Sequence, residues 1–96
     1  MSILFYIFNS DNKNLYGKIL KISNVKKLNT LDKLQITKLL QQYGTIKSFR
    51  TVIEFSINEI WLIEFIEDDT IEKIILIGLS DILRLYPTLH IGYTPL

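Results

Sequence analysis

The chain has 96 residues, of which 48% are hydrophobic and 22% are charged, and its formal net charge is +1. This length fits one domain, residues 1–96, with a single modest core, and the composition is that of a globular chain. The sequence contains no cysteine and one histidine, which excludes disulfides, thiolate metal sites and a His-rich zinc site.

Charge is divided between the two halves of the chain. Residues 1–50 carry nine Lys or Arg against two Asp, a balance of +7, whereas residues 51–96 carry two against eight carboxylates, a balance of −6. Such asymmetry indicates a nucleic-acid-binding face or charge-complementary self-association. The alternative, which stays open, is a fold that interleaves the two halves and neutralises both.

The first segment of the chain is apolar and aromatic. Ile3–Phe8 is too short to span a bilayer and lacks the basic start of a secretory signal, so we expect an intracellular protein without membrane contact. The polar residues that follow are typical of a turn. We therefore expect residues 1–14 to form an extra N-terminal strand or arm, beside a core of residues 17–94.

A strand and a helix come next. Residues 17–23 alternate in polarity, which predicts a strand. Thr30 is the expected N-cap of the helix, and Gly44 the expected left-handed residue at its end. The apolar stripe between them consists of Leu31, Leu34, Leu39, Leu40 and Tyr43.

A hairpin follows the helix. Residues 46–55 are β-branched and aromatic, residues 56–59 are a short connection, and residues 60–66 form the partner strand. Within that strand Trp61 is in phase with Ile63 and Phe65, so we expect it to face the core.

The second helix is expected to begin with a capping pair, Asp69 and Glu72. Its inward residues are Ile71, Ile74 and Ile75. Three positions remain possible for its end, namely Gly78, residues 80–81, or the residue before Pro87. Proline cannot continue a helix, so Pro87 is the last possible limit. Residues 89–93 form the last strand.

The order of these elements from residue 17 onward is β-α-β-β-α-β. It predicts an α+β, ferredoxin-like fold, in which two helices cover one face of a four-stranded antiparallel sheet.

Three segments resemble the RNA-recognition-motif (RRM) family over about residues 18–93. "ILKISNV" (19–25) resembles its first-strand hexamer, and "LLQQYGTIKSFRTV" (39–52) resembles the end of its first helix, its glycine and its second strand. "NEIWLIEFIEDDTIEKII" (58–75) resembles its third-strand octamer and second helix. The family binds RNA by stacking bases on outward aromatic residues. Those positions fall on Lys21, Ile60 and Leu62, so the resemblance implies an atypical domain that lacks the stacking residues.

The expected outward pair Ile60 and Leu62 motivates the main functional prediction. Covering each side chain fully would contribute roughly 1.5–3 kcal/mol, so we expect protein to occupy this face. The predicted function is a non-enzymatic interaction module, in which the sheet face contacts a second copy or a partner in a ribonucleoprotein or similar complex. Phe5 and Phe8 in the N-terminal run are the other predicted contact residues, unless that run covers the sheet or adds a strand to it.

Single-stranded RNA binding is the alternative function. Several cations are expected on or beside the sheet face, where they could neutralise phosphates with little sequence selectivity. They are Lys18, Lys21, Lys26, Lys27, Lys47 and Arg50. A further alternative is a small viral or phage α+β factor.

The remaining polar groups do not predict a catalytic or metal site. The carboxylates of residues 64–72 lack the ligand spacing of a calcium loop, and His90 has no nucleophile in a suitable context. We expect neither a cofactor, nor a metal, nor a small-molecule substrate.

Overall fold

A computed structural model describes residues 19–94 of the chain. The predicted N-terminal strand or arm, with Phe5 and Phe8, and also Lys18, lie outside the described residues. The elements in chain order are β1 (Ile19–Ser23), the 3-10 turn η2 (Val25–Lys27), α2 (Thr30–Gln41), β2 (Ile46–Glu54), β3 (Asn58–Phe65), α3 (Thr70–Lys73), the π-helical turn η3 (Ile74–Gly78), α4 (Leu79–Leu85) and β4 (His90–Thr94).

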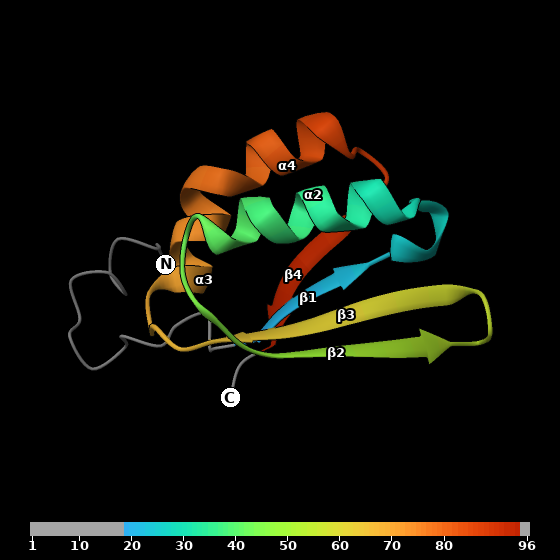
Figure 1. Cartoon of the computed structure of the whole chain (residues 1–96), viewed down its shortest axis with the longest axis horizontal. Coiled ribbons are helices and arrows are strands. Elements are labelled where there is room, and N and C mark those ends of the chain that lie inside the picture. The colour runs from blue at the N-terminus through green and yellow to red at the C-terminus, as the bar shows by residue number, and fades with distance from the viewer. Residues whose placement is uncertain (1–18, 95–96) are drawn as a thin grey trace, which may run out of the picture.

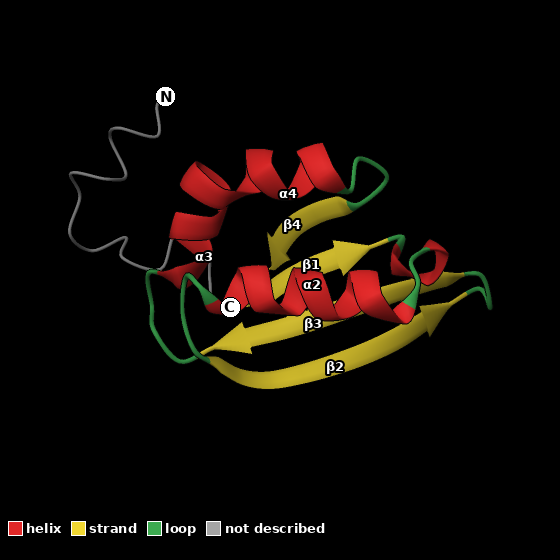
Figure 2. Ribbon diagram, turned by 45° about the horizontal axis from the view of Figure 1, so that its top comes forward, coloured by secondary structure: helices red, strands yellow, loops and turns green. Residues whose placement is uncertain are grey.

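The four strands form one antiparallel sheet in the order β2-β3-β1-β4. All the helices lie on the same side of this sheet (Figure 1). In Figure 2, β2 runs along the edge of the sheet, beyond α2. The architecture is α+β with a four-stranded antiparallel sheet, as predicted, and it is consistent with a ferredoxin-like fold.

The core lies between the sheet and the helices. It is built from apolar side chains of every layer, namely Leu20, Ile22, Val25, Ile36, Leu40, Trp61, Ile63, Phe65, Ile71, Ile74, Ile82 and Leu89. Trp61 is 4% exposed and belongs to this cluster together with residues of the helices, which confirms that it faces them. Its position fixes the register of β3, because successive side chains of a strand point to opposite faces.

The start and the buried face of α2 differ from the prediction. The N-cap is Asn29, whose side-chain oxygen accepts a hydrogen bond from the backbone N–H of Asp32 at 2.8 Å. Leu31 and Leu34 are exposed, whereas the helix buries Ile36 and Leu40. The predicted stripe is confirmed at Leu40, which is buried, and at Leu39 and Tyr43, which pack against the core, and it is wrong at Leu31 and Leu34.

Gly44 is required for close packing and not for a left-handed cap. Its φ is not positive, so the predicted conformation is wrong. A Cβ at this position would collide with the side chain of Thr70 and lie 2.8 Å from a carboxylate oxygen of Glu67. The loop after α2 thus packs directly on the loop that precedes α3.

The second helical region runs from Thr70 to Leu85 with a π-helical turn inside it. Asp69 is the N-cap residue, as predicted, but it makes no side-chain capping bond, and its carboxylate instead lies 3.5 Å from Lys73 Nζ. The inward positions of Ile71 and Ile74 are confirmed, and Ile75 packs against the core. Of the three open ends, the one before Pro87 is correct.

Two ion pairs join the basic half of the chain to the acidic half. Lys33 Nζ lies 3.2 Å from Glu59 Oε1, and Lys47 Nζ lies 3.6 Å from Glu64 Oε2. The fold therefore interleaves the halves at these points and reduces the charge separation seen along the chain.

Candidate protein-interaction surface

The predicted outward pair, Ile60 and Leu62, lies on the sheet face opposite the helices. In the register Ile60 faces Val52 and Leu62 faces Arg50, in alternation with the buried Trp61. Ile60 is only 4% exposed and Leu62 is half-buried, so the expected exposure of Ile60 is wrong. Both sit on a central strand, where neighbouring strands flank each side chain. Their contact with a partner stays a prediction.

The predicted basic residues are dispersed over the described structure. Lys21 and Arg50 are exposed and face Leu62 from either side, so the three form one row across this face. Lys26 Nζ donates a hydrogen bond to the backbone oxygen of Ser56 at 2.9 Å, and Lys27 is exposed in η2. Lys47 is the cation paired with Glu64.

Within residues 19–94 the largest run of exposed apolar side chains lies instead on β2 and the turn that follows it. We call it the β2 surface, and it consists of Phe49, Val52, Ile53, Phe55 and Ile57. Every residue of β2 after Ile46 is exposed. Sequence reasoning missed this surface, because a continuous β-branched and aromatic run is typical of a strand buried on both faces.

The β2 surface includes both faces of an edge strand. Phe49 faces Ile63 and Ile53 faces Glu59 on the helix side, whereas Val52 faces Ile60 on the other side. At the outer edge of β2 backbone N–H and C=O groups have no strand beside them in the described sheet. Free backbone groups on an edge strand that also carries exposed apolar side chains are a template for the addition of another strand.

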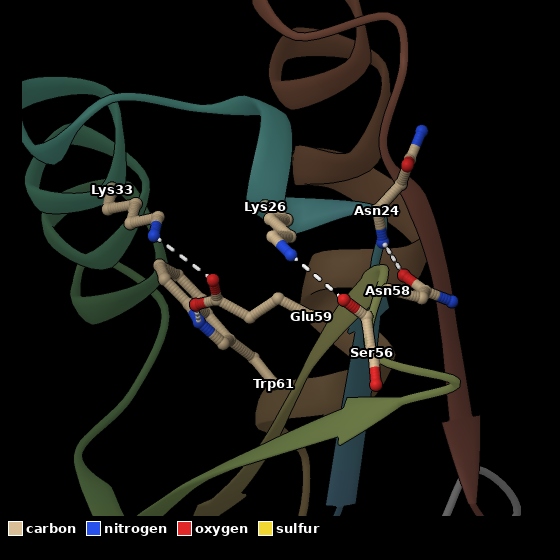
Figure 3. A network of polar contacts seen from close by, with 7 residues as sticks. All are labelled: Asn24, Lys26, Lys33, Ser56, Asn58, Glu59 and Trp61. Atoms are coloured by element: carbon tan, nitrogen blue, oxygen red, sulfur yellow. Dashed lines mark hydrogen bonds and ion pairs between the residues drawn. The ribbon is translucent and has the colours of Figure 1, made fainter.

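The ring of Trp61, against which Phe49 packs, takes part in a polar network with Glu59 and Lys33 (Figure 3). Glu59 accepts a hydrogen bond from Trp61 Nε1 at 3.0 Å and pairs with Lys33 at 3.2 Å. The ring of Trp61 is therefore fixed, and Phe49 packs edge-on against it with ring centroids 4.8 Å apart. Phe49 is therefore the member of the β2 surface that packs on the core side chain Trp61.

The hairpin tip presents an aromatic side chain in an unfavourable backbone conformation. Phe55 and Ser56 have φ values of 55° and 61°, in the left-handed region that Gly and Asn favour. Phe55 is nevertheless 85% exposed, so its burial within the chain does not compensate for the strain. Strained residues of this kind cluster at functional sites.

Two contacts support the strained tip from the far end of β1 (Figure 3). The side chain of Asn58 accepts a hydrogen bond from the backbone N–H of Asn24 at 3.0 Å, and Lys26 binds the carbonyl of Ser56. Lys26, predicted to bind RNA phosphates, thus has a structural contact that fixes the hairpin.

The edge carries few of the features that protect edge strands from pairing. A register irregularity lies between Ile46 and Ser48, but the register from Ser48 to Glu54 is regular and contains no proline. The charged residues of this regular part are Arg50 and Glu54. Within residues 19–94 neither side chain makes a hydrogen bond or an ion pair, so both are available to an added strand.

Glu67, one of the carboxylates of residues 64–72, joins the loop after α2 to the start of α3. Glu67 accepts hydrogen bonds from the backbone N–H of Thr45 at 2.7 Å, from its hydroxyl at 2.8 Å, and from the hydroxyl of Thr70 at 3.2 Å. The bonds from Thr45, the backbone N–H first, lower the pKa of Glu67 to about 2. Residues 19–94 contain no group of three or more His, Cys, Asp or Glu side chains arranged to hold a metal, and His90 is exposed on β4.

Comparisons with known proteins do not extend this description. No helix within residues 19–94 has the length and apolar character needed to cross a membrane. The chain matches no model of a protein family and none of the curated proteins searched.

Proposed function

We propose that this chain is a non-enzymatic protein-interaction module with an atypical RRM-like fold of order β-α-β-β-α-β. Its contact surface is the β2 surface, and its partner contributes a strand to the free edge of β2. The observation that carries the proposal is an edge strand with apolar side chains on both faces and free backbone groups between them.

Strand addition would satisfy backbone and side-chain groups together. Association of two molecules costs roughly 4–15 kcal/mol of lost freedom, and full burial of one large apolar side chain returns about 1.5–3 kcal/mol. Phe49 and Val52 are already partly buried, so each would contribute less than a fully exposed side chain. No single member of the β2 surface can therefore offset the cost of association. The whole surface, with the new backbone hydrogen bonds, is needed for a stable contact.

The composition of the sheet supports a protein partner over an RNA partner. The three positions where RRM domains place stacking aromatics are occupied by Lys21, Ile60 and Leu62. The exposed aromatic side chains within residues 19–94 are Phe49 on the helix side of β2, Phe55 on the hairpin tip and Tyr93 on β4, opposite the buried Leu20. Phe49 and Phe55 are therefore placed to contact a neighbour at the β2 edge, away from the face that RRM domains use.

A photo-crosslinking experiment tests the proposal. The photoreactive residue p-benzoylphenylalanine replaces Phe55 in one variant and Gln35, exposed on the outer side of α2, in the control. On irradiation in cells that express the full chain, we expect a discrete adduct from position 55 alone. Val52→Lys should remove that adduct, because it places a charge in the contact. The absence of an adduct, or equal adducts from both positions, would contradict the proposal.

Single-stranded RNA binding is a second candidate, supported by the row of Lys21, Leu62 and Arg50 across the open face. Binding by these cations alone would be weak, and each neutralised phosphate adds about −0.7 to the log–log dependence of affinity on salt. Fluorescence anisotropy of a mixed oligonucleotide at two salt concentrations measures this slope. Lys21→Glu should weaken binding, whereas Lys38→Glu, the same charge change on exposed α2, should weaken it less. Tight, salt-resistant and sequence-selective binding would overturn the protein-interaction proposal.

A further inference from the structure

We propose that the added strand is β2 of a second copy of this chain, paired antiparallel about Val52. The two four-stranded sheets then join at their β2 edges into one continuous sheet. This inference rests on the proposed function and names its partner. It is argued from the pattern of side chains along β2, which is complementary to itself in one register.

The faces of β2 limit the possible registers. Residues 50, 52 and 54 lie on the open face, and residues 49, 51 and 53 lie on the helix side. A two-fold axis perpendicular to a joined sheet keeps each face on its own side, so facing residues must belong to the same face. One residue of β2 must therefore face the same residue of the second copy across the axis. We call this residue the pivot.

Comparison of the central pivots favours Val52. A pivot at Arg50 sets two like charges opposite each other, which is unfavourable. A pivot at Thr51 sets Arg50 opposite Val52 and Glu54 opposite Ser48, so neither charge gains an opposite charge directly across. A pivot at Ile53 sets Glu54 opposite Val52 and moves Arg50 beyond the end of the partner strand.

With the pivot at Val52, the two available charges of each copy are paired. Arg50 faces Glu54 of the second copy, Glu54 faces its Arg50, and the two Val52 side chains face each other between these pairs. On the helix side Thr51 faces Ile53 of the second copy. Phe49 then lies beside the Phe55 of the second copy, which gives the exposed, strained aromatic residue a neighbour.

The shape of the edge is compatible with this pairing. The register irregularity before Ser48 and the turn at Phe55 limit the regular strand on either side, and Val52 lies inside these limits. The ribbons of α2 and α4 lie clear of the β2 edge in both views (Figures 1 and 2).

Charge reversal in the full chain tests the register. The wild-type chain should sediment as a dimer at micromolar concentration in analytical ultracentrifugation. Arg50→Glu and Glu54→Arg should each weaken that dimer by about tenfold or more, since the symmetry places each substitution in the interface twice. Lys38→Glu, away from β2, should leave the dimer unchanged. Far-ultraviolet circular dichroism establishes that each variant is folded.

Mixing the two charge-reversed variants gives the decisive result. The Arg50→Glu chain has two acidic residues at these positions and the Glu54→Arg chain has two basic ones. An equimolar mixture should therefore form a heterodimer, and the double variant should recover the homodimer. A dimer that neither reversal weakens, or reversals that do not recover on mixing, would overturn the pairing about Val52.

The outcome also separates this inference from the proposed function. A wild-type chain that is monomeric up to high micromolar concentration overturns the self-pairing. If the adduct from position 55 then has the mass of the chain plus another protein, the proposed function holds and only this inference fails. If no adduct forms at all, both fail. An adduct with twice the mass of the chain supports both.

Discussion

Replacement of Trp61 by alanine is expected to remove a large part of the stability of this domain. The ring is 4% exposed, so its loss leaves a cavity in the core, and changes of this type cost about 3–5 kcal/mol. The loss includes the edge-on contact with Phe49, worth about 0.5–1.5 kcal/mol within that total. Glu59 keeps its ion pair with Lys33, so no unpaired buried charge adds to the cost. Small domains have a total stability of roughly 5–15 kcal/mol.

Urea unfolding followed by far-ultraviolet circular dichroism measures this effect, since the substitution removes the fluorescent indole. Trp61→Phe separates packing from hydrogen bonding, because it keeps an aromatic ring but loses the N–H bond to Glu59, and it should cost about 1–2 kcal/mol. Leu31→Ala, on the exposed side of α2, is the control and should change stability by less than about 0.5 kcal/mol. A Trp61→Ala variant as stable as the wild type would refute the register of β3.

Three further changes test other parts of the structure. Glu67→Gln should destabilise the domain above pH about 4.5, where the ionised wild-type carboxylate accepts its hydrogen bonds. The difference in stability from wild type should shrink as pH falls toward the folded pKa of about 2, because the carboxylate is then protonated. Thermal unfolding across this pH range measures the difference. Gly44→Ala should cost about 1–3 kcal/mol in urea unfolding, since the added methyl group displaces Thr70, and an unchanged midpoint would contradict that packing. Phe55→Gly should leave stability unchanged or raise it by up to about 1 kcal/mol while weakening association, and a large destabilisation would show that Phe55 serves the fold.

The order of the elements could be predicted from the sequence because each has a local signal. Alternation around Trp61 identified the inward face of β3, and Pro87 set the limit of the second helical region. These signals depend on neighbouring residues and on the chemistry of single side chains. They are therefore visible without knowledge of the tertiary structure.

Burial on each face could not be predicted in the same way. Ile60 and Val52 are both β-branched and face each other on the open side of the sheet, yet Ile60 is buried and Val52 is exposed. The difference is that β3 is a central strand and β2 an edge strand. The position of a strand within a sheet depends on pairing between distant segments, which local periodicity does not contain. The candidate surface on β2 was missed for this reason.

The π-helical turn Ile74–Gly78 constrains the number of residues in the second helical region more than it constrains the identity of its exposed residues. Ile74, Gly78 and Ile82 are all buried at intervals of four residues, whereas a regular α-helix has 3.6 residues per turn. The wider turn keeps these three positions aligned, and Gly78 lies against the ring of Tyr43. Loss of one residue here would rotate everything after it by about 100° and turn Ile82 away from the core. Natural variation in this segment should therefore conserve its number of residues more strictly than the identity of the exposed Leu76 and Ile77.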